Sequence, residues 1–159
     1  MQKTNAMRIL DQGKIAYEVH EYPHGKDAVD GMTVAELLGQ DVKSVYKTLV
    51  TRGASNPAKA YYVFVIPVYA ELDLKKAAKA VGEKSVEMIH VKEINAVTGY
   101  IRGGCSPVGM KKQYRTTFHS DVTSLDTVMV SGGKIGVQIE LAPADLISAV
   151  GAQTSDIIM

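Results

Sequence analysis

Residues 60–67 restrict the possible folds more than any other part of the chain, because they are almost entirely apolar. The run Ala-Tyr-Tyr-Val-Phe-Val-Ile-Pro is rich in aromatic and β-branched residues, which favour strands. A strand that is apolar on both faces is typical of a sheet interior that other layers cover on each side. Residues 45–51 predict a second strand, and Gly53-Ala-Ser-Asn-Pro57 predicts the turn that joins the two. We therefore expect this strand pair at the centre of the fold.

Start and stop signals predict four helices around these strands. In residues 74–81, the apolar Ala77, Ala78 and Val81 share one face, while lysines occupy the other. Thr33-Val-Ala-Glu36 has the pattern of a capping box, so we expect a helix that begins there and turns Val34, Leu37 and Leu38 inward. The predicted helices start at Thr4, Thr33, Asp73 and Pro143 and end at Gly13, Gly39, Gly82 and Gly151, respectively.

Two further segments predict strands. Residues 15–20 alternate between apolar and polar side chains, and residues 127–130 and 135–141 predict a hairpin around Gly132-Gly133. Strands outnumber helices and hairpins are frequent, which favours an α+β fold with a mixed sheet and peripheral helices. A chain of 159 residues buries about 69% of its unfolded surface, enough for one core without disulfides. We expect a single domain that spans residues 1–159.

The charge and cysteine content exclude several classes of protein. Eighteen basic and seventeen acidic residues give a net charge of +1, so no bulk charge draws the molecule to DNA or to a membrane. The single Cys105 excludes an internal disulfide and a Cys-only zinc site, and it fits a reducing, cytoplasmic setting. The longest apolar run, residues 60–70, contains Pro67 and is too short to span a bilayer.

Several motifs that would indicate a particular chemistry are incomplete. Gly104-x4-Gly109 is followed by Met110-Lys111, so it lacks the Lys-Ser/Thr pair of a phosphate-binding P-loop. The sequence has no Gly-x-Ser-x-Gly motif of a serine hydrolase. His20 and His24 are four residues apart, but their segment is predicted to be strand and loop, with no third ligand. We expect these histidines to be exposed and to hold no metal.

Lys47 is the first candidate for a functional residue. Strand alternation places it on the same side of its strand as Val45 and Leu49, beside the strand that is apolar on both faces. A buried ammonium group needs a partner or loses its proton, and a pocket that binds an anionic or carbonyl oxygen would supply that partner. The alternative is a lysine whose stem packs on the protein while its head reaches water.

The second candidate is the loop Gly103-Gly-Cys-Ser-Pro-Val-Gly109. Adjacent glycines let backbone N–H groups approach an anion closely, and Ser106 adds a hydroxyl. The alternative is a tight structural turn in which Cys105 is a small buried apolar side chain. Residues 42–70 and 94–120, which hold the two candidates, contain several basic residues and no acidic ones. If the two segments meet in space, they form a positive patch suited to the end of a polyanion.

Four blocks of the sequence resemble the YbaK/EbsC family, the free-standing Cys-tRNA(Pro) deacylases related to the editing domain of prolyl-tRNA synthetases. The blocks cover residues 45–50 (Val-Tyr-Lys-Thr-Leu-Val), 72–82, 98–109 and 130–143. They occur in the same order, and the resemblance extends from about residue 4 to residue 157. It implies a YbaK-like single domain whose central sheet is largely antiparallel and partly barrel-like.

The resemblance implies a hydrolase that removes cysteine from mischarged tRNA without a metal or a cofactor. Prolyl-tRNA synthetase mischarges cysteine because a small size difference gives only about 1–3 kcal/mol of discrimination. In YbaK-type members the substrate's own thiol attacks the ester, which gives the reaction a lyase-like character. The implied partner is the 3′ end of an aminoacylated tRNA, and docking on prolyl-tRNA synthetase stays open.

The resemblance also assigns roles to individual residues. Lys47 holds oxygen atoms of the terminal adenosine, and the backbone amides of the segment Gly103-Gly104-Cys105-Ser106, with Gly103 and Gly104 as catalytic residues, form an oxyanion hole. Some members carry Asp at the position of Gln138 or an aromatic residue near Asp30-Gly31, and these differences leave the amino-acid specificity open. The residues expected to bind substrate are Tyr22, Cys105, Ser106 and Gln138.

Two alternatives to a Cys-tRNA(Pro) deacylase remain. One is a deacylase for another small mischarged residue, such as Ala-tRNA(Pro). The other is a non-catalytic module that binds tRNA ends, which Gln138 in place of a carboxylate would favour. A purely structural domain would leave the orientation of Lys47 unexplained.

Overall fold

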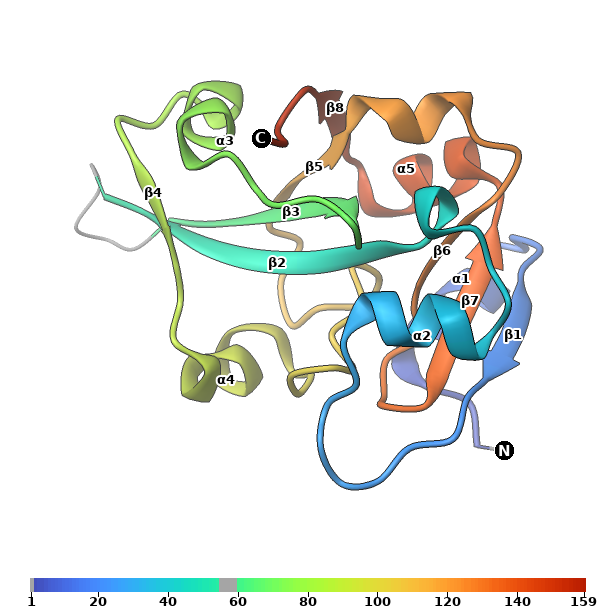
Figure 1. The fold of residues 1–159 in the computed structure, drawn as a ribbon. Helices are drawn as coiled ribbons and strands as arrows, with labels where there is room; N and C mark the ends of the chain where they lie inside the picture. Colours follow the sequence, from blue (N-terminus) through green and yellow to red (C-terminus); the bar gives the residue numbers. More distant parts are fainter. Residues whose placement is uncertain (1, 55–59) are drawn as a thin grey trace.

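The strands of the computed structural model, which describes residues 2–54 and 60–159, form two sheets (Figure 1). The larger sheet has the strand order β4-β2-β3-β5-β8 and the smaller sheet has the order β1-β7-β6. The strands are β1 (Glu18–Glu21), β2 (Tyr46–Gly53), β3 (Tyr61–Pro67), β4 (Val86–Met88), β5 (Arg115–His119), β6 (Val128–Ser131), β7 (Val137–Leu141) and β8 (Gln153–Ser155). The α-helices are α1 (Asn5–Gln12), α2 (Gly31–Leu37), α3 (Leu74–Val81), α4 (Ile94–Thr98) and α5 (Pro143–Val150). This architecture confirms the predicted α+β class.

Strand β3 lies in the middle of the larger sheet, as its uninterrupted apolar sequence predicts. It pairs antiparallel with β2 and parallel with β5, and β5 pairs parallel with β8, so the sheet is mixed. On one face Phe64 and Ile66 pack against helix α3, while on the other face Val63 and Val65 enter the main core. The strand is therefore covered on both sides, which is the physical reason for its composition.

The smaller sheet is antiparallel throughout and contacts the larger one where β6 approaches β2. A single parallel bridge joins Val45, just before β2, to Met129 of β6. The main core contains Val128 and Ile139 of this sheet together with Met7 and Leu10 of helix α1. The two sheets thus share one apolar interior.

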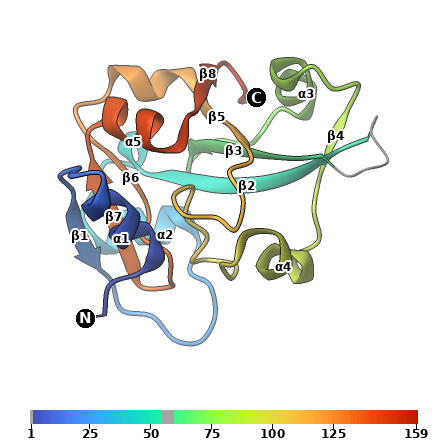
Figure 2. The ribbon, with the colours of Figure 1, turned by 180° about the vertical axis from the view of Figure 1, so that it is seen from behind.

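Figures 1 and 2 show how the remaining elements surround strands β2 and β3. Helices α3 and α4 lie on opposite sides of this strand pair, and in both views the loop that follows α4 runs between α4 and α2. That loop is the glycine-rich segment, so the fold brings it to the same side of β2 as helix α2. Within the described residues, none of the helices has the length and apolar character needed to cross a bilayer.

Most of the predicted helix boundaries are confirmed. The side chain of Thr4 caps α1 by accepting a hydrogen bond from the Met7 amide, Asp73 caps α3, and Pro143 begins α5. The boundary predicted for α2 is wrong. This helix begins at Gly31 because Asp30, and not Thr33, is its N-cap: the Asp30 carboxylate accepts hydrogen bonds from both the amide and the hydroxyl of Thr33.

Other departures from the predicted elements have physical causes. Leu37 was expected to face inward, but it is exposed, because the buried side of α2 consists of Val34 and Ala35. Strand β1 begins at Glu18 and not at residue 15, since its pairing with β7 starts there. The short elements β4, α4, β5 and β8 carry weak local signals and were not predicted. The turn predicted at residues 53–57 extends outside the described residues.

Candidate active site

A cavity of about 440 Å³ opens beside Lys47, and it is the feature on which the predicted site residues converge. Its walls come from β2, from the segment that leads into α2, from the glycine-rich loop and from the paired strands β6 and β7. Lys47 and Arg102 both line it, so the two basic segments that lack acidic residues meet here. The predicted site residues in its lining are Tyr22, Lys47, Gly103, Cys105 and Gln138.

Strand β2 holds Lys47 in the cavity wall. The backbone of Lys47 pairs with Ile66 of the buried strand β3, and Val45 and Leu49, two residues away on either side, line the same cavity. The side chain is half-buried, and its ammonium has no hydrogen bond or ion pair within the part of the chain that the structure describes. A half-buried cation next to a cavity, without a protein partner, is suited to bind an oxygen-bearing ligand.

Buried polar atoms without partners surround the same cavity. They are the hydroxyl oxygens of Tyr22 and Thr48 and the side-chain carbonyl oxygen of Gln138. Tyr22 is only 4% exposed and Gln138 only 7%. A buried polar atom that lacks a hydrogen bond destabilises a fold by about 1–3 kcal/mol. Three such atoms at one cavity therefore indicate a place that is completed by a ligand.

Gly103 forms the loop side of the cavity, and its backbone requires glycine. Its φ is +84°, and a Cβ atom built there would lie 2.6 Å from the Cβ of Ala28. The amides of Gly103 and Cys105 donate no hydrogen bond within the described residues. These two N–H groups are therefore free to bind a ligand oxygen.

The other two residues predicted from this loop lie outside the cavity lining. The amide of Gly104 donates a 3.0 Å hydrogen bond to the Ile101 carbonyl, and a Cβ atom at Gly104 would meet the backbone of Lys134 at 2.7 Å. The Ser106 side chain is fully buried, and its hydroxyl accepts a hydrogen bond from the Val108 amide. The structure therefore does not bring Gly104 and Ser106 into the cavity lining, and both residues shape the turn.

Cys105 lies between the cavity and the interior. Burial raises the pKa of its thiol to about 11, and a hydrogen bond with Thr98 opposes that shift only in part. The thiol is consequently protonated at neutral pH, and a thiolate is the form that acts as a nucleophile. This environment favours the interpretation of the Cys105 side chain as a small apolar group and not as a nucleophile.

Sequence reasoning did not assign three further polar residues of the cavity wall to the site: Thr48, Arg102 and Ser131. Arg102 directly precedes Gly103, but the sequence identifies it only as one of the cations of the basic segment 94–120. Thr48 follows Lys47, and strand alternation assigned it to the opposite side, but it lines the same cavity. The carboxylate of Asp30 is occupied by Thr33, and these hydrogen bonds lower its pKa.

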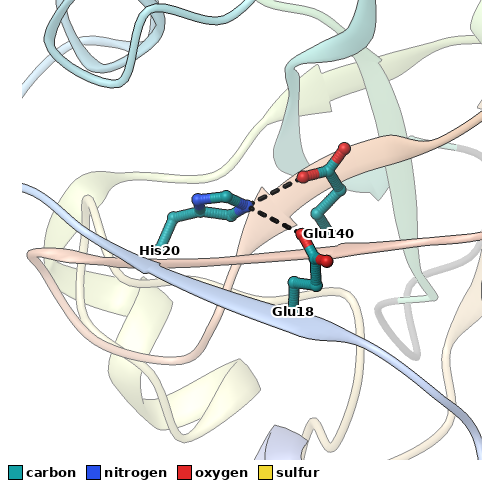
Figure 3. A group of neighbouring side chains, drawn as sticks. All are labelled: Glu18, His20 and Glu140. Atoms are coloured by element: carbon teal, nitrogen blue, oxygen red, sulfur yellow. Dashed lines mark hydrogen bonds and ion pairs between the residues drawn. The ribbon is translucent and has the colours of Figure 1, made fainter.

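Among the described residues, one group of side chains has the spacing of a metal site, and it lies outside the cavity (Figure 3). It consists of Glu18, His20 and Glu140, whose ligand atoms lie within 4.8 Å of one another. His20 Nε2 is 2.8 Å from one carboxylate oxygen of Glu140 and 3.9 Å from Glu18. His24 does not join the group, because its Nδ1 is 2.8 Å from the Gly25 carbonyl. The contacts are those of an imidazole that is hydrogen-bonded to a neighbouring carboxylate.

Comparisons with known proteins find relatives along nearly the whole chain. Residues 26–149 match the aminoacyl-tRNA editing domain family. A protein of Enterococcus faecalis, EbsC, is named as a candidate Cys-tRNA(Pro)/Cys-tRNA(Cys) deacylase. The two chains are 48% identical over 157 residues, which cover 98% of this chain and 93% of that protein.

Two solved structures share the fold over almost the whole chain. One is described as a candidate trans-editing enzyme for prolyl tRNA synthetase, with a TM-score of 0.82, 25% identity, and coverage of 100% of this chain and 99% of the other. The second, the hypothetical protein APE2540, has a TM-score of 0.85 at 22% identity and covers 98% of this chain and 100% of its own. This second likeness concerns the fold alone.

Proposed function

Because the chain belongs to the aminoacyl-tRNA editing domain family, we propose that it is a trans-editing deacylase that hydrolyses the ester of mischarged Cys-tRNA(Pro). One observation carries the proposal. Lys47, without a partner among the described residues, shares a cavity with Gly103 and Cys105, whose amides are free. An ester carbonyl gains negative charge when it is attacked, and fixed donors stabilise that charge. On this proposal the domain spans residues 1–159 and acts in the cytoplasm.

Lys47 and the loop amides have distinct roles. The Lys47 ammonium holds oxygen atoms of the aminoacylated terminal adenosine, which places the ester in the cavity. The N–H groups of Gly103 and Cys105 donate to the carbonyl oxygen as it becomes an oxyanion. Gly104 takes no part, since its amide is used within the turn.

The unpartnered acceptors of the cavity bind the amino acid. The carbonyl oxygen of Gln138 and the hydroxyl of Tyr22 accept hydrogen bonds from the amino group of the bound cysteine. Binding satisfies atoms that the free protein leaves buried without partners. The interaction energy that these atoms lack in the free protein is thereby used to hold the substrate.

The cysteine thiol of the substrate is the nucleophile in this mechanism. Its sulfur forms a bond to the carbonyl carbon while the ester C–O bond breaks, and the thiol proton passes to the leaving ribose oxygen. Water then opens the resulting cyclic thioester. The Cys105 thiol does not compete, because burial keeps it protonated.

The proposed partner is the 3′ end of the charged tRNA, and prolyl-tRNA synthetase is the proposed source of the mischarged substrate. The cations Lys47 and Arg102 at the cavity suit the phosphate and ribose oxygens of an RNA end. A protein with a net charge of only +1 would bind this end locally and not along the length of a duplex.

A deacylation panel tests the proposal. Cys-, Ala- and Pro-tRNA(Pro) are each incubated with the protein, with and without prolyl-tRNA synthetase, and the released amino acid is measured. We expect release of cysteine at least about ten times faster than release of alanine, because alanine has no thiol to attack the ester. Rapid release of alanine would indicate water activated by the protein. Salt-sensitive tRNA binding with no release from any substrate would identify a binding module.

A further inference from the structure

A second cavity, of about 340 Å³, adjoins the proposed active site. The two cavities share Thr48, Leu49, Arg102, Gly103 and Cys105 as a common wall. The remaining walls of the second cavity are apolar and come from Val50 of β2, the end of β4, the segment before α4 and α4 itself. We name it the apolar cleft and define it by Met88, Ile89, Val91 and Ile94.

Two side chains of the apolar cleft are unusually exposed for apolar residues. Met88 is 45% exposed and Val91 is 55% exposed, although both lie within a few residues of buried core. The neighbouring Ile89, by contrast, is only 8% exposed. Exposed apolar side chains gathered at the rim of a functional cavity are typical of a binding surface.

Arg102 stands where the two cavities meet. It lines both of them and also a third, open depression beside Lys26 and Ile135. Its side chain is exposed, and its guanidinium has no hydrogen bond or ion pair to any residue described in the structure. By contrast, Arg52 on β2 is occupied by Glu87 and Glu93. Arg102 is therefore available to a phosphate between the two cavities.

The chemistry of the proposed substrate connects these features. The amino acid is esterified to the ribose of the last nucleotide, so a cysteine bound beside Lys47 places that ribose at the cavity mouth. The base attached to the same ribose must then lie next to the cavity. Single-stranded RNA ends are recognised largely through bases that are turned out and packed on side chains.

We propose that the apolar cleft binds the base of the 3′-terminal nucleotide of the charged tRNA, and that Arg102 binds the phosphate on its 5′ side. This inference rests on the proposed function. The cleft is continuous with the proposed active site through five shared residues, and its apolar walls suit the faces of a base. The cation at the junction complements the phosphate charge.

The test combines a change in the protein with a change in the substrate. The protein variant Met88→Gln/Val91→Thr makes the cleft polar at two exposed positions without adding charge. The substrate variant is a microhelix of the tRNA(Pro) acceptor stem that carries cysteine on a terminal nucleotide without its base. The control variant is Leu74→Gln on α3, which is 43% exposed and lines none of these cavities.

We expect the effect of the protein variant on KM to depend strongly on whether the substrate carries the terminal base. With the intact microhelix, the double variant should raise KM about tenfold and change kcat less than about twofold, whereas Leu74→Gln should match the wild type. With the microhelix that lacks the base, wild type and double variant should have the same KM. If the double variant weakens both substrates equally, or neither, the cleft does not bind the base. If the wild type releases no cysteine at all, the proposed function itself fails.

Discussion

Two side chains on one face of strand β7, Glu140 and Gln138, differ in how their hydrogen bonds are satisfied. The Glu140 carboxylate lies 2.8 Å from His20 Nε2, as Figure 3 shows, and it also accepts a hydrogen bond from the Thr127 hydroxyl. Gln138 lies opposite His20 in the β1–β7 register, and its side-chain oxygen is buried without a partner beside the cavity. Glu140 and Gln138 lie only two residues apart on β7, yet the first has its hydrogen-bond partners and the second lacks one.

This difference distinguishes polar groups that stabilise the fold from polar groups that are available to a ligand. A carboxylate that accepts its hydrogen bonds within the sheet is satisfied in the free protein, so these bonds contribute to folding and are not available to a ligand. An unpartnered buried oxygen destabilises the free protein and can gain a bond only when a ligand enters. The variants that follow test whether activity depends on the groups at the cavity and stability on the paired Glu140.

Lys47→Ala should have the largest effect. Removing the ammonium takes away the half-buried charged donor on β2, and we expect kcat/KM for Cys-tRNA(Pro) to fall by about 100-fold or more. Thermal unfolding should be unchanged or slightly improved, because the ammonium has no partner within the described residues. The control is Lys43→Ala, an exposed lysine outside the cavity. Wild-type rates for Lys47→Ala would remove this residue from the mechanism.

Gly103→Ala should weaken both activity and stability. The left-handed backbone at φ +84° costs an alanine about 1–2 kcal/mol, and the added Cβ would also contact Ala28 at 2.6 Å. Gly39→Ala is the matched control: its φ is +63°, but no atom lies within 4 Å of the added Cβ. We expect Gly39→Ala to lose only the backbone contribution, measured by urea unfolding, and to keep full deacylation. Equal behaviour of the two variants would contradict a packing role for Gly103.

Tyr22→Phe should lower activity without lowering stability. The hydroxyl of Tyr22 is buried at the cavity without a partner, so its removal should leave the free energy of unfolding unchanged or raise it by up to about 1 kcal/mol. Deacylation should fall about tenfold because a substrate hydrogen bond is lost. Tyr46→Phe removes another buried, unpartnered hydroxyl that lines none of the cavities described above. Tyr46→Phe should change the free energy of unfolding to a similar extent and leave the deacylation rate unchanged.

Glu140→Gln should have the smallest effect and should concern stability alone. The Thr127 hydroxyl and then His20 lower the pKa of Glu140 below its ordinary 4.5. A lowered pKa stabilises the fold above pH 4.5, and this contribution is lost as the pH falls through the folded-state value. The variant should therefore lose less than about 1 kcal/mol at pH 7 and converge with the wild type near pH 3. The free energies of unfolding of the variant and the wild type, measured at pH 7 and near pH 3, check this expectation. A lower deacylation rate of the variant would contradict a role for Glu140 in stability alone.

Much of the fold follows from local patterns. The buried strand β3, the capped helices α1 and α3 and the β6–β7 pair all have signals that lie within their own segments. The N-cap of α2 was misplaced because Asp30 and Thr33 both fit the local pattern, and the contact between them decides which one caps the helix. The short strands β4, β5 and β8 exist because the larger sheet offers them partners, so their own sequences say little.

The sequence by itself determined the class of fold, the buried strand, the side of β2 from which Lys47 projects and the family to which the chain is related. Only the tertiary structure decided which amides of the glycine-rich loop are free, that Arg102 lies between two cavities, and that Gln138 is unpartnered while Glu140 is paired. The physical reason is the separation along the chain between the residues that interact. Periodicity and capping depend on neighbours along the chain, whereas an unsatisfied hydrogen bond depends on every group that the fold brings within about 3 Å.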